Sequence, residues 1–324
     1  MEAVGRALGH LDGFQQSHAV LGFPLAVMKK MSDDNLGSQA ALITYYGLFA
    51  LFPLLLLLTT ILGFALEGHP GFQQAVLHSA LATFPIIGSQ LRHNVHSLSG
   101  SGLALVVGIL GTLYGTLGIG ETAQSAVNTV WNVPYKDWPG FVMSRLRGLA
   151  ILALLAAGVL SSTALAALGT EVLHGAPTRL LALLGSIGVD LGLYLAAFMI
   201  LTAKKLPWRD VLPGAAVATL FWEGLQVLGS WYVSRELSHA SSTYGFFAIV
   251  IALMSWIYLA AELTLIAAEI NVVHLYRLWP RSLRQTRLND ADRKTLDRLA
   301  QMSVRRKEMS VRTSFSSSAE EPPP

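Results

Sequence analysis

Five acidic residues lie deep inside long apolar stretches of this 324-residue chain: Glu121, Asp190, Glu223, Glu262 and Glu269. An acid in apolar surroundings can hold a proton, hydrogen-bond a polar neighbour or bind a cation. Its ionised form costs about 2.5 kcal/mol or more at the centre of a lipid bilayer. We therefore expect all five acids to face the protein interior. We also expect no lysine or arginine to neutralise them, because none lies deep in the same stretches.

The stretches that hold these acids have the length and composition of membrane-spanning helices. The chain is 52% hydrophobic and 13% charged, whereas an ordinary soluble domain is about 25% charged. A spanning helix needs roughly 20 mostly apolar residues. Six stretches meet this need and predict an all-α, polytopic membrane protein, built as a six-transmembrane-helix bundle: about 38–66, 102–128, 147–169, 179–203, 211–233 and 244–275.

Lysine and arginine are distributed unevenly between the two sides of this predicted bundle. The N-terminal segment, the second loop and the fourth loop carry three each, and the segment from Arg277 carries eleven. The first, third and fifth loops, on the opposite side, carry one lysine or arginine each. Positively charged loops tend to stay in the cytoplasm. The side that holds both termini carries twenty lysines and arginines and the other side three, so we predict that both termini are cytoplasmic.

Helical spacing groups the acids with other polar residues. Glu262 and Glu269 are seven positions apart and therefore share a helix face, as do Glu121 and Asn128. Three of the acids fall near the middle of their stretches, whereas Glu121 and Glu269 lie in the cytoplasmic half. The pattern predicts a polar path from the midplane to the cytoplasm, with these candidate residues: Glu121, Asn128, Asp190, Glu223, Glu262, Glu269 and Asn271.

Two interpretations of these polar residues remain open. In the structural one, they form interhelical hydrogen bonds worth about 0.6 kcal/mol each. In the functional one, they line a proton- or cation-coupled path, or a cavity for a polar head group. The similar depth of three acids favours the functional interpretation.

The segments around the predicted bundle divide the chain into three parts. Residues 1–37 form a cytoplasmic N-terminal segment with an interfacial helix, 38–275 the six-helix transmembrane domain, and 276–324 a basic cytoplasmic tail. Residues 72–84, in the first outer loop, have the apolar spacing of an extracytoplasmic amphipathic helix. In the tail, Asn289 or Asp290 is expected to cap a helix, and the Ser/Pro/Glu-rich residues 310–324 are expected to be disordered.

Several chemistries are not expected from this sequence. It has no cysteine, so disulfides, Cys-ligated zinc and thiol catalysis are excluded. His93 and His96 are three positions apart, but two histidines without a nearby carboxylate are a weak metal signal. We predict no metal site, no cofactor and no enzymatic activity. Nucleic acid is not expected as a partner either, since the basic tail is explained by topology and by attraction to anionic lipid.

Three motifs resemble the YihY/BrkB family of bacterial inner-membrane proteins. They are "AALITYYGLFALFPLLLLL" in the first predicted span, "AVNTVWNVP" after the second, and "STYGFFAIVIALMSWIYLAAELTLIAAEINVVH" in the last. The family pattern Asn-x-x-Trp and its last-span pattern are matched by Asn128, Trp131, Tyr244, Gly245, Trp256, Tyr258, Glu269 and Asn271. Where the family has Gly-Ala before the glutamate, this chain has Ala267 and Ala268.

The resemblance implies a multi-pass protein of the bacterial inner membrane with a role in the cell envelope. It suggests transport or export of lipid or other solutes. Together with the acidic path inferred from the residues, this predicts a transporter or a lipid or solute translocase. The alternative is a scaffold or regulator of envelope assembly that transports nothing. Some family members carry a ribonuclease label, but this sequence has no H-x-H-x-D-H cluster to hold catalytic metal ions. The expected partners are membrane lipids, envelope proteins and a second copy of the chain.

Overall fold

The computed structural model describes residues 12, 15, 18–65, 102–171, 176–235, 245–282 and 288–315, and this part of the chain is helical, without a strand. The long helices are α3 (Leu36–Ala65), α6 (Gly102–Val130), α7 (Phe141–Glu171), α8 (Ala176–Leu201), α9 (Trp208–Arg235) and α10 (Gly245–Tyr276). The shorter ones are α2 (Ala19–Asp33), the 3-10 turn η2 (Tyr135–Asp137) and α11 (Asp290–Met302).

The six long helices match the six predicted apolar stretches to within a few residues, except that α7 begins earlier, at Phe141. Three stretches within them are both long and apolar enough to cross a membrane, counted over the described residues: Leu183–Leu201 in α8, Trp208–Gly229 in α9 and Val250–Tyr276 in α10. The helices are therefore confirmed, and six membrane crossings stay a prediction. The predicted amphipathic helix at 72–84 lies outside the described residues.

The contacts between the long helices close into a ring. Each packs against the next along the chain, from α3 through α6, α7, α8 and α9 to α10, and α10 returns to contact α3. The ring is tight where small residues meet: a Cβ on Gly120 of α6 would lie 2.8 Å from the Cα of Gly148 on α7. Such close approach maximises van der Waals contact, which is the main attraction between helices in lipid.

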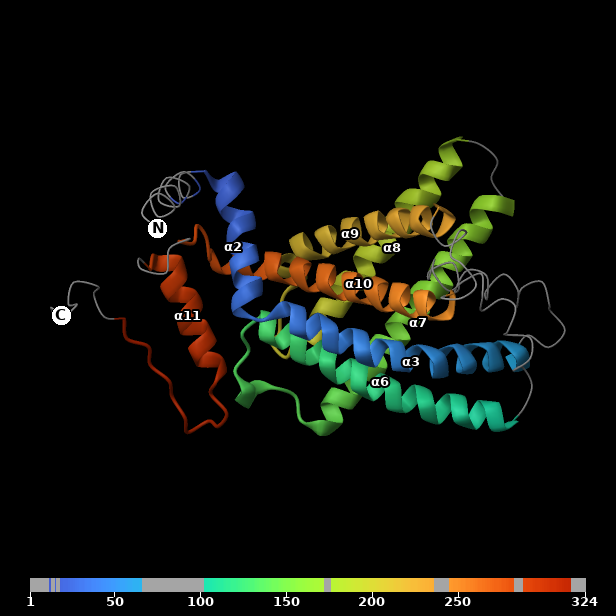
Figure 1. The fold of residues 1–324 in the computed structure, drawn as a ribbon, viewed down its shortest axis with the longest axis horizontal. Helices are drawn as coiled ribbons and strands as arrows, with labels where there is room; N and C mark the ends of the chain where they lie inside the picture. The colour runs from blue at the N-terminus through green and yellow to red at the C-terminus, as the bar shows by residue number, and fades with distance from the viewer. Residues whose placement is uncertain are drawn as a thin grey trace.

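The buried hydrophobic cluster of the described residues gathers at one end of this ring. Helix α2 lies across that end, and α11 lies further out on the same side (Figure 1). Ala26 and Val27 of α2 are buried against the bundle, and Phe23 makes edge-to-face contacts with His274 and Trp279 at the end of α10. Helix α2 lies within the predicted N-terminal segment, residues 1–37, and its position at a membrane interface stays a prediction.

The tail is more ordered than its composition predicts. Asn289 caps α11 with a capping box, in which its side chain accepts from the Asp292 N–H, so the predicted cap is confirmed. Residues 310–315, expected to be disordered, instead lie along α11. Gln301 donates to the Val311 carbonyl at 2.7 Å, and the Thr313 hydroxyl donates to Asp297 at 2.6 Å. Residues 316–324 lie outside the described residues.

Candidate functional site

A buried charge cluster, Lys30, Asp34 and Glu269, joins α2, the turn after it and α10. The Lys30 ammonium lies 2.5 Å from an Asp34 oxygen and 2.9 Å from Glu269 Oε2, and all three side chains are fully buried. The expectation that no lysine or arginine neutralises the intramembrane acids is therefore wrong for Glu269. Its predicted interior position is confirmed.

Local sequence explains how Lys30 and Asp34 come together. They are four residues apart, which places them on one face where α2 ends. The chain then turns through Asn35, whose φ of 53° is in the left-handed region that asparagine tolerates. Helix α3 begins directly afterwards, at Leu36. This short connection fixes the two charged side chains against α10.

The end of α6 completes the surroundings of the charge cluster. Its last carbonyl groups have no partner within the helix and attract cations. Lys30 donates to the Val130 carbonyl at 2.8 Å, and Arg298 of α11 donates to the Trp131 carbonyl at 3.1 Å. The Asn132 side-chain amide donates to Asp34 at 3.3 Å. The cluster thus ties α2, α6, α10 and the turn before α3 into one unit.

Pairing in this buried region is incomplete. Among the described residues, Glu269 Oε1 has no hydrogen-bond donor, and Asn132 Oδ1 and Asn271 Nδ2 have no partner. Buried polar atoms of this kind are uncommon in native proteins and mark sites of water, ligand or stored strain. Lys30 nevertheless pairs with Glu269 Oε2 at 2.9 Å, so these unpartnered atoms surround a formed ion pair.

Asn128 and Asn271 hold backbone segments with their side-chain oxygens. Asn128 accepts from the Ala203 N–H at 2.7 Å, just after α8. Asn271 accepts from the Gly214 N–H at 2.6 Å, and a Cβ on Gly214 would overlap both the Ala267 carbonyl and the Asn271 amide. Both asparagines are buried, as predicted, and each fastens the start or end of a neighbouring helix.

A second acidic site lies between α8, α9 and α10. The side chains of Asp190 and Glu223 lie close to each other, and Tyr194 lies close to Thr264. Among the described residues, no lysine or arginine forms an ion pair with either acid. We refer to Asp190 and Glu223 as the acid pair.

The remaining two predicted acids lie apart from these sites. Glu262 is half-buried on α10. Glu121 lies 3.7 Å from Arg145 of α7, and its side chain is 68% exposed. Two expectations are wrong for Glu121: it does not face the interior, because its position on α6 turns it toward α7 and the surface, and it pairs with an arginine. The structure brings Asp190 to Glu223 but does not join Glu121 to either.

Sequence reasoning missed Lys30 and Asp34. Lys30 follows ten mostly apolar residues of a predicted interfacial helix, and this position led us to count it as a cytoplasmic topology charge. A signal was available, since an aspartate follows it at the helical spacing of four. That spacing indicates an ion pair but not its burial.

A further ion cluster holds the tail against α2. Asp292 of α11 lies 2.9 Å from Lys29 and 2.8 Å from Arg281, and Arg281 also lies 2.6 Å from Asp33. Burial raises the pKa of Asp292, but hydrogen bonds from Lys29, Arg281 and the Ser282 N–H outweigh this effect and lower it below the ordinary value of 3.8. The contacts fix α11 to α2.

This lowered pKa predicts how docking of α11 depends on pH. A carboxyl group whose pKa is lowered on folding stabilises the fold above its unfolded pKa, and this contribution disappears as pH falls through the folded pKa. Amide hydrogen exchange of α11 should therefore show constant protection from neutral pH to about pH 4 and a loss below 3.8. Asp292→Asn should weaken protection at neutral pH, whereas Asp290→Asn, on the exposed side of the same turn, should not. Loss of protection between pH 7 and pH 5 would contradict the assignment.

The described fold and its buried charges are those of an all-helical membrane protein. A model of the virulence factor BrkB family matches residues 27–290, which enclose the charge cluster and the acid pair. The chain therefore belongs to the virulence factor BrkB family, and the resemblance inferred from the motifs is confirmed. The described residues contain no group of three or more histidine, aspartate or glutamate side chains placed to hold a metal ion.

Several relatives from bacteria align with most of this chain. The ribonuclease-like protein YfkH of Bacillus subtilis is 27% identical over 73% of this chain and 89% of its own length. Inner membrane protein YhjD of Escherichia coli is 24% identical over 77% of this chain and 80% of its own. A UPF0761 membrane protein of Chromohalobacter salexigens is 29% identical over 73% of this chain but only 59% of its own length. No solved structure matches significantly.

Proposed function

We propose that this protein is a transporter that moves a lipid or another polar solute across the bacterial inner membrane. Six described helices are 26 to 32 residues long. At about 1.5 Å per residue they measure about 39–48 Å, enough for a hydrocarbon core of about 30 Å. This length supports a multi-pass arrangement with six crossings, and the excess of lysine and arginine supports cytoplasmic termini.

The observation that carries the proposal is the acid pair. Asp190 and Glu223 lie within the candidate spans Leu183–Leu201 and Trp208–Gly229, and no described cation pairs with them. Two acidic side chains that lie close together in an apolar region are suited to bind a proton or a cation. Ionisable groups at membrane depth are costly and usually serve a proton or ion pathway. In this proposal, the acid pair binds and releases a proton or a cation as the solute moves.

The charge cluster supplies the second part of the proposal. Glu269 follows Thr264 by five residues on α10, a rise of about 7.5 Å toward the end covered by α2. Lys30 links α2 to α10 at this end. The Glu269 Oε1 atom has no hydrogen-bond partner among the described residues, so the contact between the two helices leaves one acceptor unpaired. The charge cluster would act as the gate at the α2 end of the path. Glu262, Asn128 and Asn271 would lie along or beside that path.

A flux measurement tests the role of the acid pair. The full chain is reconstituted into liposomes, and leaflet exchange of a fluorescent lipid is followed together with internal pH. Asp190→Asn and Glu223→Gln should each slow movement by about tenfold or more, because neither variant can pass a proton through the pair. Glu308→Gln, on the exposed tail, makes the same chemical change outside the bundle and should leave the rate unchanged. Wild-type rates in both acid-pair variants would contradict the proposal.

A non-transporting envelope scaffold is the second candidate function. It is favoured by the tail, because the ion cluster around Asp292 fixes α11 on the bundle while Arg293 and Lys294 remain exposed for a partner. In that case deletion of residues 288–324 would abolish function in the cell, and the acid-pair variants would stay active. Neither candidate includes ribonuclease activity.

A further inference from the structure

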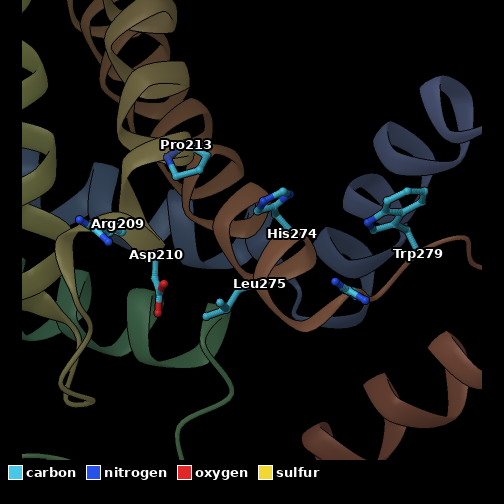
Figure 2. Close-up of a pocket in the computed structure, with 7 residues that line it drawn as sticks. Arg209, Asp210, Pro213, His274, Leu275 and Trp279 are labelled. Atoms are coloured by element: carbon cyan, nitrogen blue, oxygen red, sulfur yellow. The ribbon is translucent and has the colours of Figure 1, made fainter.

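A polar cavity of about 690 Å³ lies where α9 begins and α10 ends. Figure 2 shows Arg209 and Asp210, from the start of α9, across from His274 near the end of α10, with Trp279 beyond it. Arg277 completes the polar lining. The cavity is separate from the acid pair and from the charge cluster, and neither of the functions proposed above uses it.

The cavity is positively charged, and one of its two arginines, Arg209, lies over the Trp208 ring at 5.5 Å from the ring centroid. Two arginines against one aspartate leave a net charge of +1 with His274 neutral. Among the described residues, neither Arg209 nor Arg277 forms an ion pair, whereas Arg145 and Arg281 do. A guanidinium group without a carboxylate partner is well suited to bind phosphate through two parallel hydrogen bonds.

The backbone at Arg277 indicates that its side chain matters. Its φ is 51°, in the left-handed region, directly after the last residue of α10. The next N–H, of Leu278, donates to the Val273 carbonyl at 3.1 Å and closes the helix end. Glycine is the usual residue at this position, because a side chain there is strained. This chain has arginine at this strained position, in the wall of the cavity.

The position of the cavity indicates which kind of anion it would bind. The apolar segment of α9 starts at Trp208 and that of α10 ends at Tyr276, so the cavity lies at the boundary of two candidate membrane spans. Trp208 is 52% exposed, as aromatic residues at the headgroup level often are. Lys204 and Lys205 are exposed on the segment leading into α9. The phosphates of a bilayer lie at this level, and basic pockets there bind anionic headgroups.

We propose that this cavity binds the phosphate group of an anionic membrane lipid, with Arg209 and Arg277 as its two cationic ligands. Binding does not depend on whether the protein moves that lipid. A soluble phosphate compound offers the same chemistry to two guanidinium groups. The lipid is favoured because the cavity opens at the end of the apolar segments, where acyl chains can lie beside α9 and α10 while the phosphate enters the cavity.

Lipid binding by the full-length protein in a neutral detergent tests this proposal. Phosphatidylglycerol is added, and bound lipid is measured by native mass spectrometry. Arg209→Gln and Arg277→Gly should each weaken binding by about tenfold. Arg306→Gln removes the same charge from the exposed tail and should have no effect. Arg277→Gly keeps the left-handed helix end without strain, so a loss of binding with unchanged or higher thermal stability separates ligand binding from folding.

Two further arms identify the source of the phosphate. Phosphatidylcholine, which has no net charge, should bind wild type and the Arg277→Gly variant equally weakly. Inorganic phosphate alone, at millimolar concentration, should not displace phosphatidylglycerol. Complete displacement would overturn the lipid assignment in favour of a soluble phosphate. Equal phosphatidylglycerol affinity in wild type and both arginine variants would overturn the site.

Discussion

Replacing Lys30 with methionine is expected to lower the free energy of unfolding by about 3–5 kcal/mol, since removing one partner of a buried ion pair leaves an uncompensated charge. Asp34 and Glu269 are both fully buried, and both lie against the same ammonium group. The Val130 carbonyl would lose its donor as well. Methionine retains most of the volume of the lysine stem, so the loss reports charge rather than a cavity.

Reversible unfolding in mixed micelles measures this loss. Lys205→Met makes the same change at an exposed position and should shift the free energy by less than about 0.5 kcal/mol. The double variant Lys30→Met with Glu269→Gln removes one of the two stranded acids, and it should recover part of the loss but not all of it, because Asp34 remains. A Lys30→Met variant as stable as Lys205→Met would show that the charge cluster does not form.

The helices could be predicted because their signal is local. Six apolar stretches of sufficient length are enough to place α3, α6, α7, α8, α9 and α10, without knowledge of how they pack. The cap of α11 is equally local, because Asn289 and Asp292 have the spacing of a capping box. The closed ring was not predictable in this way, since the return of α10 to α3 joins segments separated by about 180 positions or more.

The charge cluster shows why the site was only half predicted. An acid in an apolar stretch is conspicuous, and Glu269 and Asn271 were found for that reason. A lysine near the end of an amphipathic segment is ordinary, because its charge can reach water along a flexible stem. The burial of Lys30 follows from where α2 is placed, on a junction between α10 and the end of α6. That placement is tertiary and leaves no periodic trace in the sequence.

Residues 310–315 illustrate a similar limit of composition. A serine- and charge-rich segment does not bury enough apolar surface to fold alone. Here the segment is held by individual hydrogen bonds to α11, one of which ends on a backbone carbonyl, that of Val311. A backbone acceptor is present at every residue whatever the composition. The contact therefore depends on Gln301 and on the position of α11.

Gly214 and Gly224 offer a matched pair of substitutions on one helix, with opposite expected signs. A Cβ on Gly214 would overlap the Ala267 carbonyl and the Asn271 amide, whereas a Cβ on Gly224 meets nothing within 4 Å. Gly214→Ala should therefore cost about 3 kcal/mol, from overpacking of α9 on α10 and from disruption of the Gly214 to Asn271 hydrogen bond. Gly224→Ala should stabilise by about 0.5–1 kcal/mol, because alanine restricts the unfolded chain and favours helix.

The comparison separates packing from helix propensity, because both positions lie in α9 and within the candidate span Trp208–Gly229. Unfolding in mixed micelles gives the two free energies, and the difference between the variants should be about 3–4 kcal/mol. Equal effects of the two substitutions would mean that α9 does not approach α10 closely at Gly214. The Asn271 side chain would then be free to serve the polar path instead of the helix contact. A large difference between the free energies of the two variants would show that the main role of Asn271 is to hold α9 against α10, near the buried Glu269.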